Sequence, residues 1–232
     1  MCGRFTLTVT IGLPERFGVT HCDLPLVPRY NIAPSQPVPV VIRPSGSASE
    51  CHAMTWGLLP AGATDPGKSQ RPINARAESL QDRPAFRPLL DSRRCLVPAT
   101  GFFEWVRSAK SPVPYYITRK DGGLFAFAGL YDIWRSPDGA VLRTFTIITT
   151  RPNTLAARYH DRMPAILLPE HQGRWLGPGW HQVGVDAVVF FQFFEQLHFG
   201  VDGDIAHAHR RHIGGVARQC LGDQAGGGGE VD

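Results

Sequence analysis

The sequence lacks the features that mark a disulfide-built, zinc-built or membrane-spanning chain. Only five of its 232 residues are cysteine, and no two are spaced Cys-x-x-Cys. An odd count without paired spacing argues against a disulfide framework or a structural zinc site and suits a reducing cytoplasm. The N-terminus has no basic segment followed by an apolar one, so no signal peptide is expected. The longest apolar run, 187–194, is too short to cross a bilayer.

Charge is also sparse. The chain carries 24 basic and 20 acidic residues, for a net charge of +4, and 43% of it is hydrophobic. This composition indicates a globular protein rather than a disordered one. The small basic excess permits a nucleic-acid partner without requiring one. Six arginines between Arg71 and Arg94 form either a solvated basic face or a surface for an anionic partner.

Long helical patterns are scarce, because 25 glycines and 20 prolines favour turns and short strands. Strands are expected at 38–43, 94–98, 101–106, 115–119, 125–134 and 144–149. Turn residues at 121–123 and 137–139 are typical of hairpin connections. Short helices are expected at 13–18, 77–81, 154–159 and 170–175, and Asn153 can cap the third of these. The sequence therefore predicts an α+β fold, a curled β-sheet or partial barrel with short peripheral helices.

The composition changes near residue 182. We expect one domain over 1–182, followed by an atypical segment, 183–232, that is divergent or partly disordered. The His-x-His spacing of His207 and His209, with His212 and Cys220 nearby, is a pattern that metal sites use. No function requires such a site, so we expect neither a metal nor a cofactor.

Cys2 is the first candidate for chemistry. Removal of Met1 leaves one carbon that bears both a free α-amine and a thiol. The amine condenses with an aldehyde to an imine, and the thiol then closes onto it as a five-membered thiazolidine ring. The alternative is that Cys2 is an incidental small residue at a frayed terminus.

Three further segments carry candidate groups. Asn74, Arg76 and Glu78 alternate and would share one face of an extended segment, as a phosphate-binding edge or as a salt-bridged strand end. Glu104 lies among aromatic residues and is either exposed or buried with a raised pKa that suits proton transfer. His160 follows a short expected helix and can exchange protons near pH 7. Its neighbours Asp161 and Arg162 can pair with each other.

Six blocks occur in a fixed order: Met1-Cys-Gly-Arg-Phe5, Tyr30-Asn-Ile-Ala-Pro34, Trp56-Gly57, Asn74-Ala-Arg-Ala-Glu78, Gly101-Phe-Phe-Glu-Trp105 and His160-Asp-Arg-Met-Pro164. Together they resemble the SRAP family, the abasic-site-processing proteins once labelled SOS-response-associated peptidases. The resemblance covers about residues 1–175. It implies a β-rich pseudo-barrel of mixed sheets with a positively charged DNA cleft.

The resemblance also implies a mechanism. The mature Cys2 would attack the ring-opened abasic sugar in single-stranded DNA and form a stable thiazolidine cross-link. Asn74 would position the link, Glu104 would shuttle protons, and His160 would assist ring opening and reversal. Phosphates beside the lesion would be bound by three arginines: Arg4, Arg76 and Arg162. A cytoplasmic monomer that acts on abasic single-stranded DNA, away from membranes, is therefore expected.

Two departures from the family pattern stand out. The loop at 58–64 has no aromatic residue where family members commonly carry a tryptophan that wedges against bases. No counterpart of the usual final strand is found beyond about Gln182, and a missing strand would leave a sheet edge exposed.

Two other functions remain open. A cysteine peptidase would use Cys2 and His160 as a dyad, with removal of Met1 as self-processing. A non-covalent single-strand binder would need several exposed aromatic residues along a basic groove.

Overall fold

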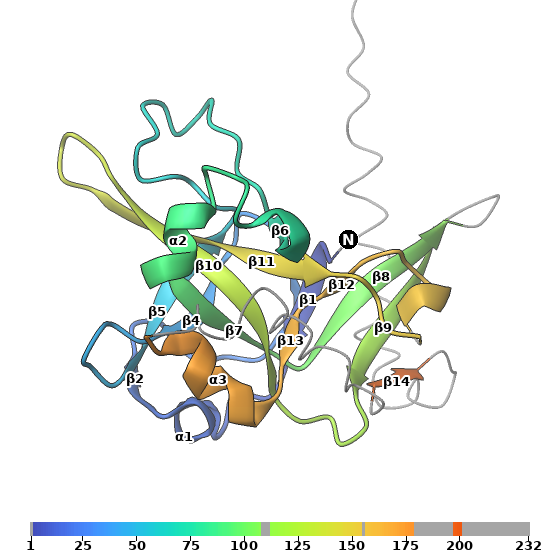
Figure 1. Cartoon of the computed structure of the whole chain (residues 1–232). Helices are drawn as coiled ribbons and strands as arrows, with labels where there is room; N and C mark the ends of the chain where they lie inside the picture. Colours follow the sequence, from blue (N-terminus) through green and yellow to red (C-terminus); the bar gives the residue numbers. More distant parts are fainter. Residues whose placement is uncertain (1, 108–111, 155, 179–196, 201–232) are drawn as a thin grey trace, which may run out of the picture.

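Five strands close into a barrel at the centre of the fold (Figure 1). The computed structural model describes residues 2–107, 112–154, 156–178 and 197–200. Within the barrel β10 pairs with β7 and β11, β7 with β4, β4 with β5, and β5 with β11. The β5–β11 pairing is parallel and the other four are antiparallel, so the barrel is mixed. The strands are β4 (Pro37–Ile42), β5 (Ser49–Trp56), β7 (Arg94–Ala99), β10 (Phe125–Arg135) and β11 (Val141–Thr150).

The α+β prediction is confirmed, and the sheet closes further than the expected partial barrel. All six residues of β7 and the first eight of β10 are buried, so both faces of these strands are covered. In the core Trp56 stacks on Phe145, with ring centroids 6.4 Å apart. Gly57 follows with φ +122, a conformation that glycine adopts without steric cost.

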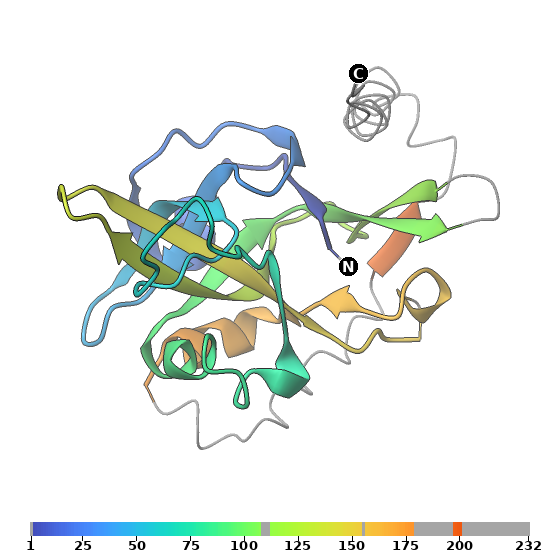
Figure 2. The same ribbon diagram turned by 90° about the horizontal axis from the view of Figure 1, so that it is seen from above.

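A second, antiparallel sheet packs against the barrel in the order β14-β9-β8-β1-β3. The two layers meet through aromatic contacts, because Phe127 lies 5.8 Å from Phe5 and 5.9 Å from Phe102 between ring centroids. Figure 2 shows β8 and β9 extending beyond the barrel. The strands are β1 (Arg4–Leu7), β3 (Arg29–Ile32), β8 (Gly101–Arg107), β9 (Pro112–Arg119) and β14 (Leu197–Gly200).

Short elements complete the described chain. They are α1 (Leu13–Phe17), β2 (Val19–Cys22), β6 (Asn74–Arg76), η1 (Ala77–Ser79), α2 (Arg87–Ser92), η2 (Ala156–Arg158), β12 (Met163–Pro164), β13 (Ile166–Leu167) and α3 (Pro169–Leu176). The helix α2 was not predicted, and the helix expected at 77–81 is a single 3-10 turn. Asn153 caps η2 as predicted, since its Oδ1 accepts a 2.8 Å hydrogen bond from the Ala156 N–H.

Arg94 departs from the basic face that the sequence indicated for 71–94. Its guanidinium is buried and donates to the main-chain carbonyls of Trp175 (2.6 Å), Gly177 (2.7 Å) and Leu90. Three carbonyls at helix ends thus take up the donors of one cation. Arg94 ties α2 and α3 to the barrel and offers nothing to a partner.

Two further expectations are corrected. Residues 121–123 do not form a hairpin, because β9 pairs with β8 and β14 whereas β10 pairs in the barrel. Cys22 and Cys51 form a disulfide, where the spacing gave no sign of a pair. They are Cα partners on β2 and β5, so strand pairing, which spacing does not reveal, brings them together.

Because no final strand was found in the sequence beyond residue 182, we expected an exposed sheet edge. At β9 this edge is covered by another strand. Residues 197–200 form β14 and pair with 116–119 of β9. The candidate metal ligands His207, His209, His212 and Cys220 lie outside the described residues. In the part of the chain that is described, no helix is long and apolar enough to span a membrane.

Candidate active site

Cys2 lies just before β1 and is fully buried, at 0% exposure. Its Sγ is 3.9 Å from the Arg4 carbonyl oxygen. Burial raises the pKa of the Cys2 thiol, and the negative charge of Glu104 raises it further. The thiol is therefore neutral at pH 7. Met1 precedes Cys2 in the sequence, so the Cys2 nitrogen becomes a free amine only when Met1 is removed.

Asn74 is held against Cys2 by two barrel contacts. Trp56 Nε1 donates a 2.8 Å hydrogen bond to the Ile73 carbonyl, and β6 pairs in parallel with β11 through Asn74 and Ile147. The Asn74 side chain then donates from Nδ2 to the Cys2 carbonyl oxygen at 2.8 Å. Among the described residues nothing donates to its Oδ1, which is buried. The Trp56-Gly57 block thus supports the Asn74 block.

The sequence left open whether the Glu104 carboxyl is exposed or buried, and in the structure it is buried. It lies on β8 and is 3% exposed. Burial raises the pKa of its carboxyl, and the charge of Asp161 acts in the same direction. A carboxyl with a raised pKa can exchange protons nearer to neutral pH than an exposed one. Its strand β8 pairs with β1 through Phe103 and Arg4, the residues next to Glu104 and two after Cys2, and its charge acts on the Cys2 thiol.

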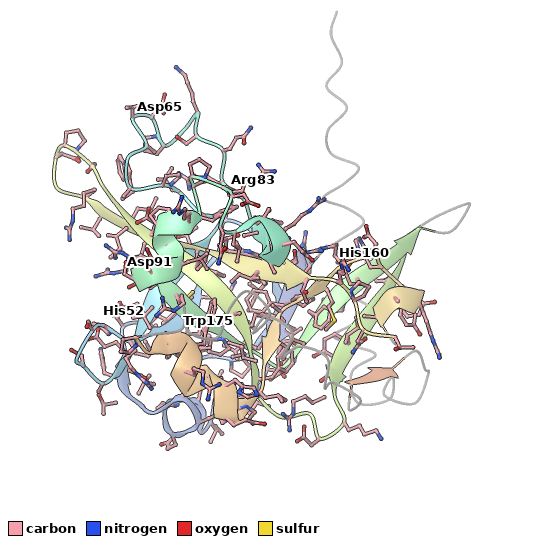
Figure 3. All side chains as sticks on the ribbon, viewed as in Figure 1. His52, Asp65, Arg83, Asp91, His160 and Trp175 are labelled. Carbon is pink, nitrogen blue, oxygen red and sulfur yellow. A yellow bond between two sulfur atoms is a disulfide. The ribbon has the colours of Figure 1, made fainter. Side chains whose placement is uncertain are left out.

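His160 lies in the segment between β11 and β12, a quarter exposed, on the opposite side of the molecule from His52 (Figure 3). Its Nδ1 is 3.0 Å from the Arg162 backbone nitrogen and 2.7 Å from Asp161 Oδ1. One nitrogen cannot accept from the amide and donate to the carboxylate at once. The amide contact belongs to a neutral ring with its proton on Nε2, and the carboxylate contact to a ring protonated on Nδ1. His160 therefore has a partner in either protonation state.

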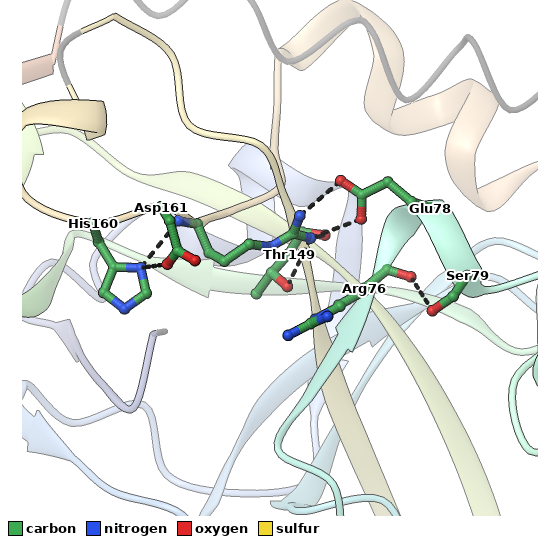
Figure 4. A network of polar contacts seen from close by, with 7 residues as sticks. Arg76, Glu78, Ser79, Thr149, His160 and Asp161 are labelled. Atoms are coloured by element: carbon green, nitrogen blue, oxygen red, sulfur yellow. Dashed lines mark hydrogen bonds and ion pairs between the residues drawn. The ribbon is translucent and has the colours of Figure 1, made fainter.

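The three arginines expected at phosphates have different surroundings. Arg4 is half-buried and donates to Asn31 Oδ1 at 3.0 Å, while Arg76 is exposed. Arg162 is engaged by Glu78 through contacts of 2.7 and 2.9 Å, and it also donates to the Thr149 carbonyl at 2.6 Å (Figure 4). The pairing of Arg162 with Asp161 that the sequence allowed is not seen. The hydrogen bond from Arg162 lowers the pKa of the Glu78 carboxyl.

Sequence reasoning missed several neighbours of these groups. Glu78 was grouped with Asn74 and Arg76, but its role as the partner of Arg162 depends on contact between distant segments. Tyr115 and Tyr159, whose ring centroids are 4.6 Å apart, were not singled out. The signal for Tyr115 is strand register, since Tyr115 is the partner of Glu104 in the β8–β9 pairing. In the described residues no cluster of His, Cys, Asp and Glu is suited to a metal.

Named proteins are similar to this chain in sequence. The chain is 45% identical over 183 residues to the abasic site processing protein YoqW of Bacillus subtilis, covering 77% of this chain and 81% of that protein. It is 33% identical over 182 residues to the abasic site processing protein HMCES of Xenopus tropicalis, covering 66% of this chain and 54% of that one.

Solved structures share the fold. A protein from Bacteroides thetaiotaomicron has a TM-score of 0.74 at 29% identity, over 85% of this chain and 90% of that one. A protein from Bordetella bronchiseptica has a TM-score of 0.68 at 24% identity, over 85% and 98%. Residues 1–196 match the family described as SOS response associated peptidase (SRAP). This chain belongs to the SRAP family.

Proposed function

We propose that this protein processes abasic sites by capturing their aldehyde in single-stranded DNA through Cys2, after removal of Met1. The observation that carries the proposal is the placement of Asn74 and Glu104 at Cys2: an amide bonded to its carbonyl and a buried carboxyl in the same cluster. The naming of relatives at 45% and 33% identity as abasic site processing proteins supports the substrate.

The chemistry balances without a cofactor. The freed Cys2 amine adds to the aldehyde carbon of the ring-opened sugar, and loss of water gives an imine. The Cys2 sulfur then adds to the imine carbon, the thiol proton passes to the nitrogen, and a thiazolidine ring results. Protonated Glu104 can donate to the departing hydroxyl and take up the N–H proton as the imine forms, and it can then relay the thiol proton to that nitrogen when the ring closes. A raised pKa favours this role, because the carboxyl must hold its proton at the start.

The burial of Cys2 sets a condition on the proposal. A sulfur at 0% exposure cannot reach a DNA sugar. Capture therefore requires that removal of Met1 free the amine and open the site around the sulfur. Retention of Met1 should abolish cross-linking for both reasons.

His160 and the arginines take supporting roles. His160 would donate or accept a proton during ring opening and reversal, with Asp161 and the Arg162 amide as its alternate partners. Arg4 and Arg76 would bind phosphates beside the lesion. Arg162 would reach a phosphate while held by Glu78, or on leaving it. The protein would act in the cytoplasm as a monomer. Light scattering on the purified protein checks the oligomeric state.

The deciding experiment incubates the protein with single-stranded DNA that carries a uracil-derived abasic site. We expect an adduct that survives denaturing electrophoresis, and a mass increase on the N-terminal peptide. Cys2→Ala should give no adduct. Cys95→Ala removes the second buried free thiol of the described residues, on β7, and should react as the wild type does. A tetrahydrofuran analogue, which has no aldehyde, should bind without linkage.

Cross-linking at the wild-type rate by a Met1-retained form, or by Cys2→Ala, would overturn the proposal. A peptidase with Cys2 as its nucleophile is the less favoured function. Such an enzyme needs a thiolate, and burial raises the pKa of this thiol instead. Hydrolysis of peptides in trans that depends on Cys2 and His160 would favour it.

A further inference from the structure

Tyr115 and Tyr159 form an aromatic pair beside the candidate active site. Both side chains are half-buried, their ring centroids are 4.6 Å apart, and the ring planes are tilted by 52°. Tyr115 belongs to β9 and Tyr159 to the segment between β11 and β12. Tyr159 directly precedes His160 in the chain. The pair therefore joins the two segments that flank Glu104 and His160.

Strand register places Tyr115 on the same face of the sheet as Glu104. The two residues are Cα partners in the antiparallel β8–β9 pairing, so their side chains leave the sheet on one face, with Cβ atoms about 5 Å apart. The next pair on that face, Phe102 and Ile117, is 1% exposed and belongs to the core. Along this face the surroundings pass from the apolar core, through the buried carboxyl, to a partly exposed aromatic ring.

Because an abasic nucleotide has no base, the base beside it loses one of its stacking partners. An aromatic ring next to the captured sugar can replace that partner, and a tyrosine face accepts any of the four bases. The phenol rings would contact a base while the exposed arginine Arg76 contacts phosphate. The tilt between the two rings gives the pair two differently oriented surfaces.

We propose that Tyr115 and Tyr159 form a stacking subsite for the base adjacent to the abasic sugar. This inference rests on the proposed function, since it takes the sugar to lie at Cys2 and Glu104. It assigns the pair a role in binding the neighbouring nucleotide and no part in the covalent step.

The test measures binding to single-stranded oligonucleotides that contain one tetrahydrofuran site. In one ligand both neighbours of that site carry bases, and in two others the 5′ or the 3′ neighbour is also a tetrahydrofuran. We expect the wild type to lose about tenfold in affinity when one of the two neighbouring bases is removed. Tyr115→Leu and Tyr159→Leu should bind all three ligands alike, whereas Tyr115→Phe and Tyr159→Phe, which keep the ring, should retain the preference.

Two outcomes would overturn the subsite. One is a wild type that shows no preference for a neighbouring base. The other is a pair of leucine variants that weaken binding to all three ligands by the same factor and so keep the wild-type preference, which would indicate that the tyrosines only hold the His160 segment in place.

A second measurement needs no variant, in case a leucine variant does not fold. A 2-aminopurine next to the tetrahydrofuran should change its emission when the wild-type protein saturates the oligonucleotide. Unchanged emission at both neighbouring positions would contradict stacking. The tetrahydrofuran has no aldehyde, so these results do not depend on Cys2, and failure of the capture assay is read separately.

Discussion

The Asn74 side chain donates a 2.8 Å hydrogen bond to the main-chain carbonyl of Cys2, joining β6 to the N-terminus across 72 residues of sequence. The parallel pairing of β6 with β11 fixes the backbone position of Asn74. A terminus that would otherwise fray is thereby held beside Glu104. Preorganisation of this kind is what covalent capture at a chain end requires.

Replacing Asn74 should slow capture with little loss of stability. Asn74→Ala and Asn74→Asp both remove the donor to Cys2, and one neutral hydrogen bond contributes about 1 kcal/mol. We expect the cross-linking rate to fall by about tenfold, while the melting temperature falls by only a few degrees. Asn153→Ser, which changes another asparagine but keeps a capping oxygen, is the control. Equal rates in all four proteins would show that the Cys2 carbonyl contact has no role in capture.

Glu104→Gln should stabilise the protein at neutral pH and slow the reaction. The folded pKa of Glu104 is raised, so the native state binds its proton more tightly than the unfolded chain, whose glutamate pKa is about 4.3. Stability is therefore lost as pH rises from about 4.3 through the folded pKa. Glutamine does not ionise, so the variant should melt a few degrees higher at pH 7 and about level with the wild type near pH 4.

The kinetic part of that prediction is separate. Loss of a proton donor and acceptor should reduce the capture rate by roughly 10²-fold. Affinity for the tetrahydrofuran oligonucleotide should stay nearly unchanged. A variant that loses affinity in proportion to rate would show that Glu104 acts in binding rather than in proton transfer.

Glu78→Gln should destabilise the protein with the opposite pH dependence. The Glu78 pKa is lowered by its hydrogen bond from Arg162, so its stabilisation is present above the unfolded pKa of about 4.3 and is lost as pH falls through the folded pKa. Because the Glu78 side chain is 42% exposed, solvent screening limits the contribution of the pair to the free energy of unfolding to about 0.5–1 kcal/mol. Thermal melts from pH 7 to pH 3 should show the difference from wild type shrinking with acid. A gap that stays constant would exclude the ion pair as its cause.

Reduction should lower the stability of the wild type but not of a Cys22→Ser, Cys51→Ser double variant. The disulfide closes a separation of 29 residues, and such links typically contribute about 2–4 kcal/mol. Titration of thiols in the denatured, unreduced protein should give two fewer than after reduction. If the full number of thiols titrates without reductant, the two cysteines are not bonded in the purified protein.

Arg76→Ala should weaken DNA binding in a salt-dependent way. Arg76 is exposed on β6 next to the site, and loss of one phosphate contact on a single strand reduces the slope of log K against log salt by about 0.7. Binding titrations between 50 and 200 mM salt measure that slope. The control is Arg83→Ala, because Arg83 lies before α2 and is exposed, as Arg76 is. Arg94 is buried and would not serve as a control. A slope equal to that of wild type would remove Arg76 from the phosphate contacts.

Much of the secondary structure was predictable from local patterns. The runs of apolar, aromatic and β-branched residues at 94–98, 125–134 and 144–149 correspond to β7, β10 and β11, and Asn153 caps η2 as its side chain favours. The turn at 121–123 was misassigned because a turn fixes only a local reversal. Which sheet the next strand joins depends on packing. The helix α2 was missed because it is short and contains a proline, and its apolar residues gain stability only by packing against the barrel.

By itself the sequence determined the chemistry that is available: an aminothiol at Cys2 once Met1 is removed, and an amide, a carboxyl and an imidazole in recognisable blocks. Tertiary structure alone decided how these groups act on one another. Burial of Glu104 on β8 of the second sheet raises its pKa, strand pairing brings Cys22 to Cys51, and Glu78 engages Arg162 across 84 residues of sequence. The physical reason is that burial and long-range contact set the dielectric surroundings and the partners of a charged group, and neither is encoded in local spacing.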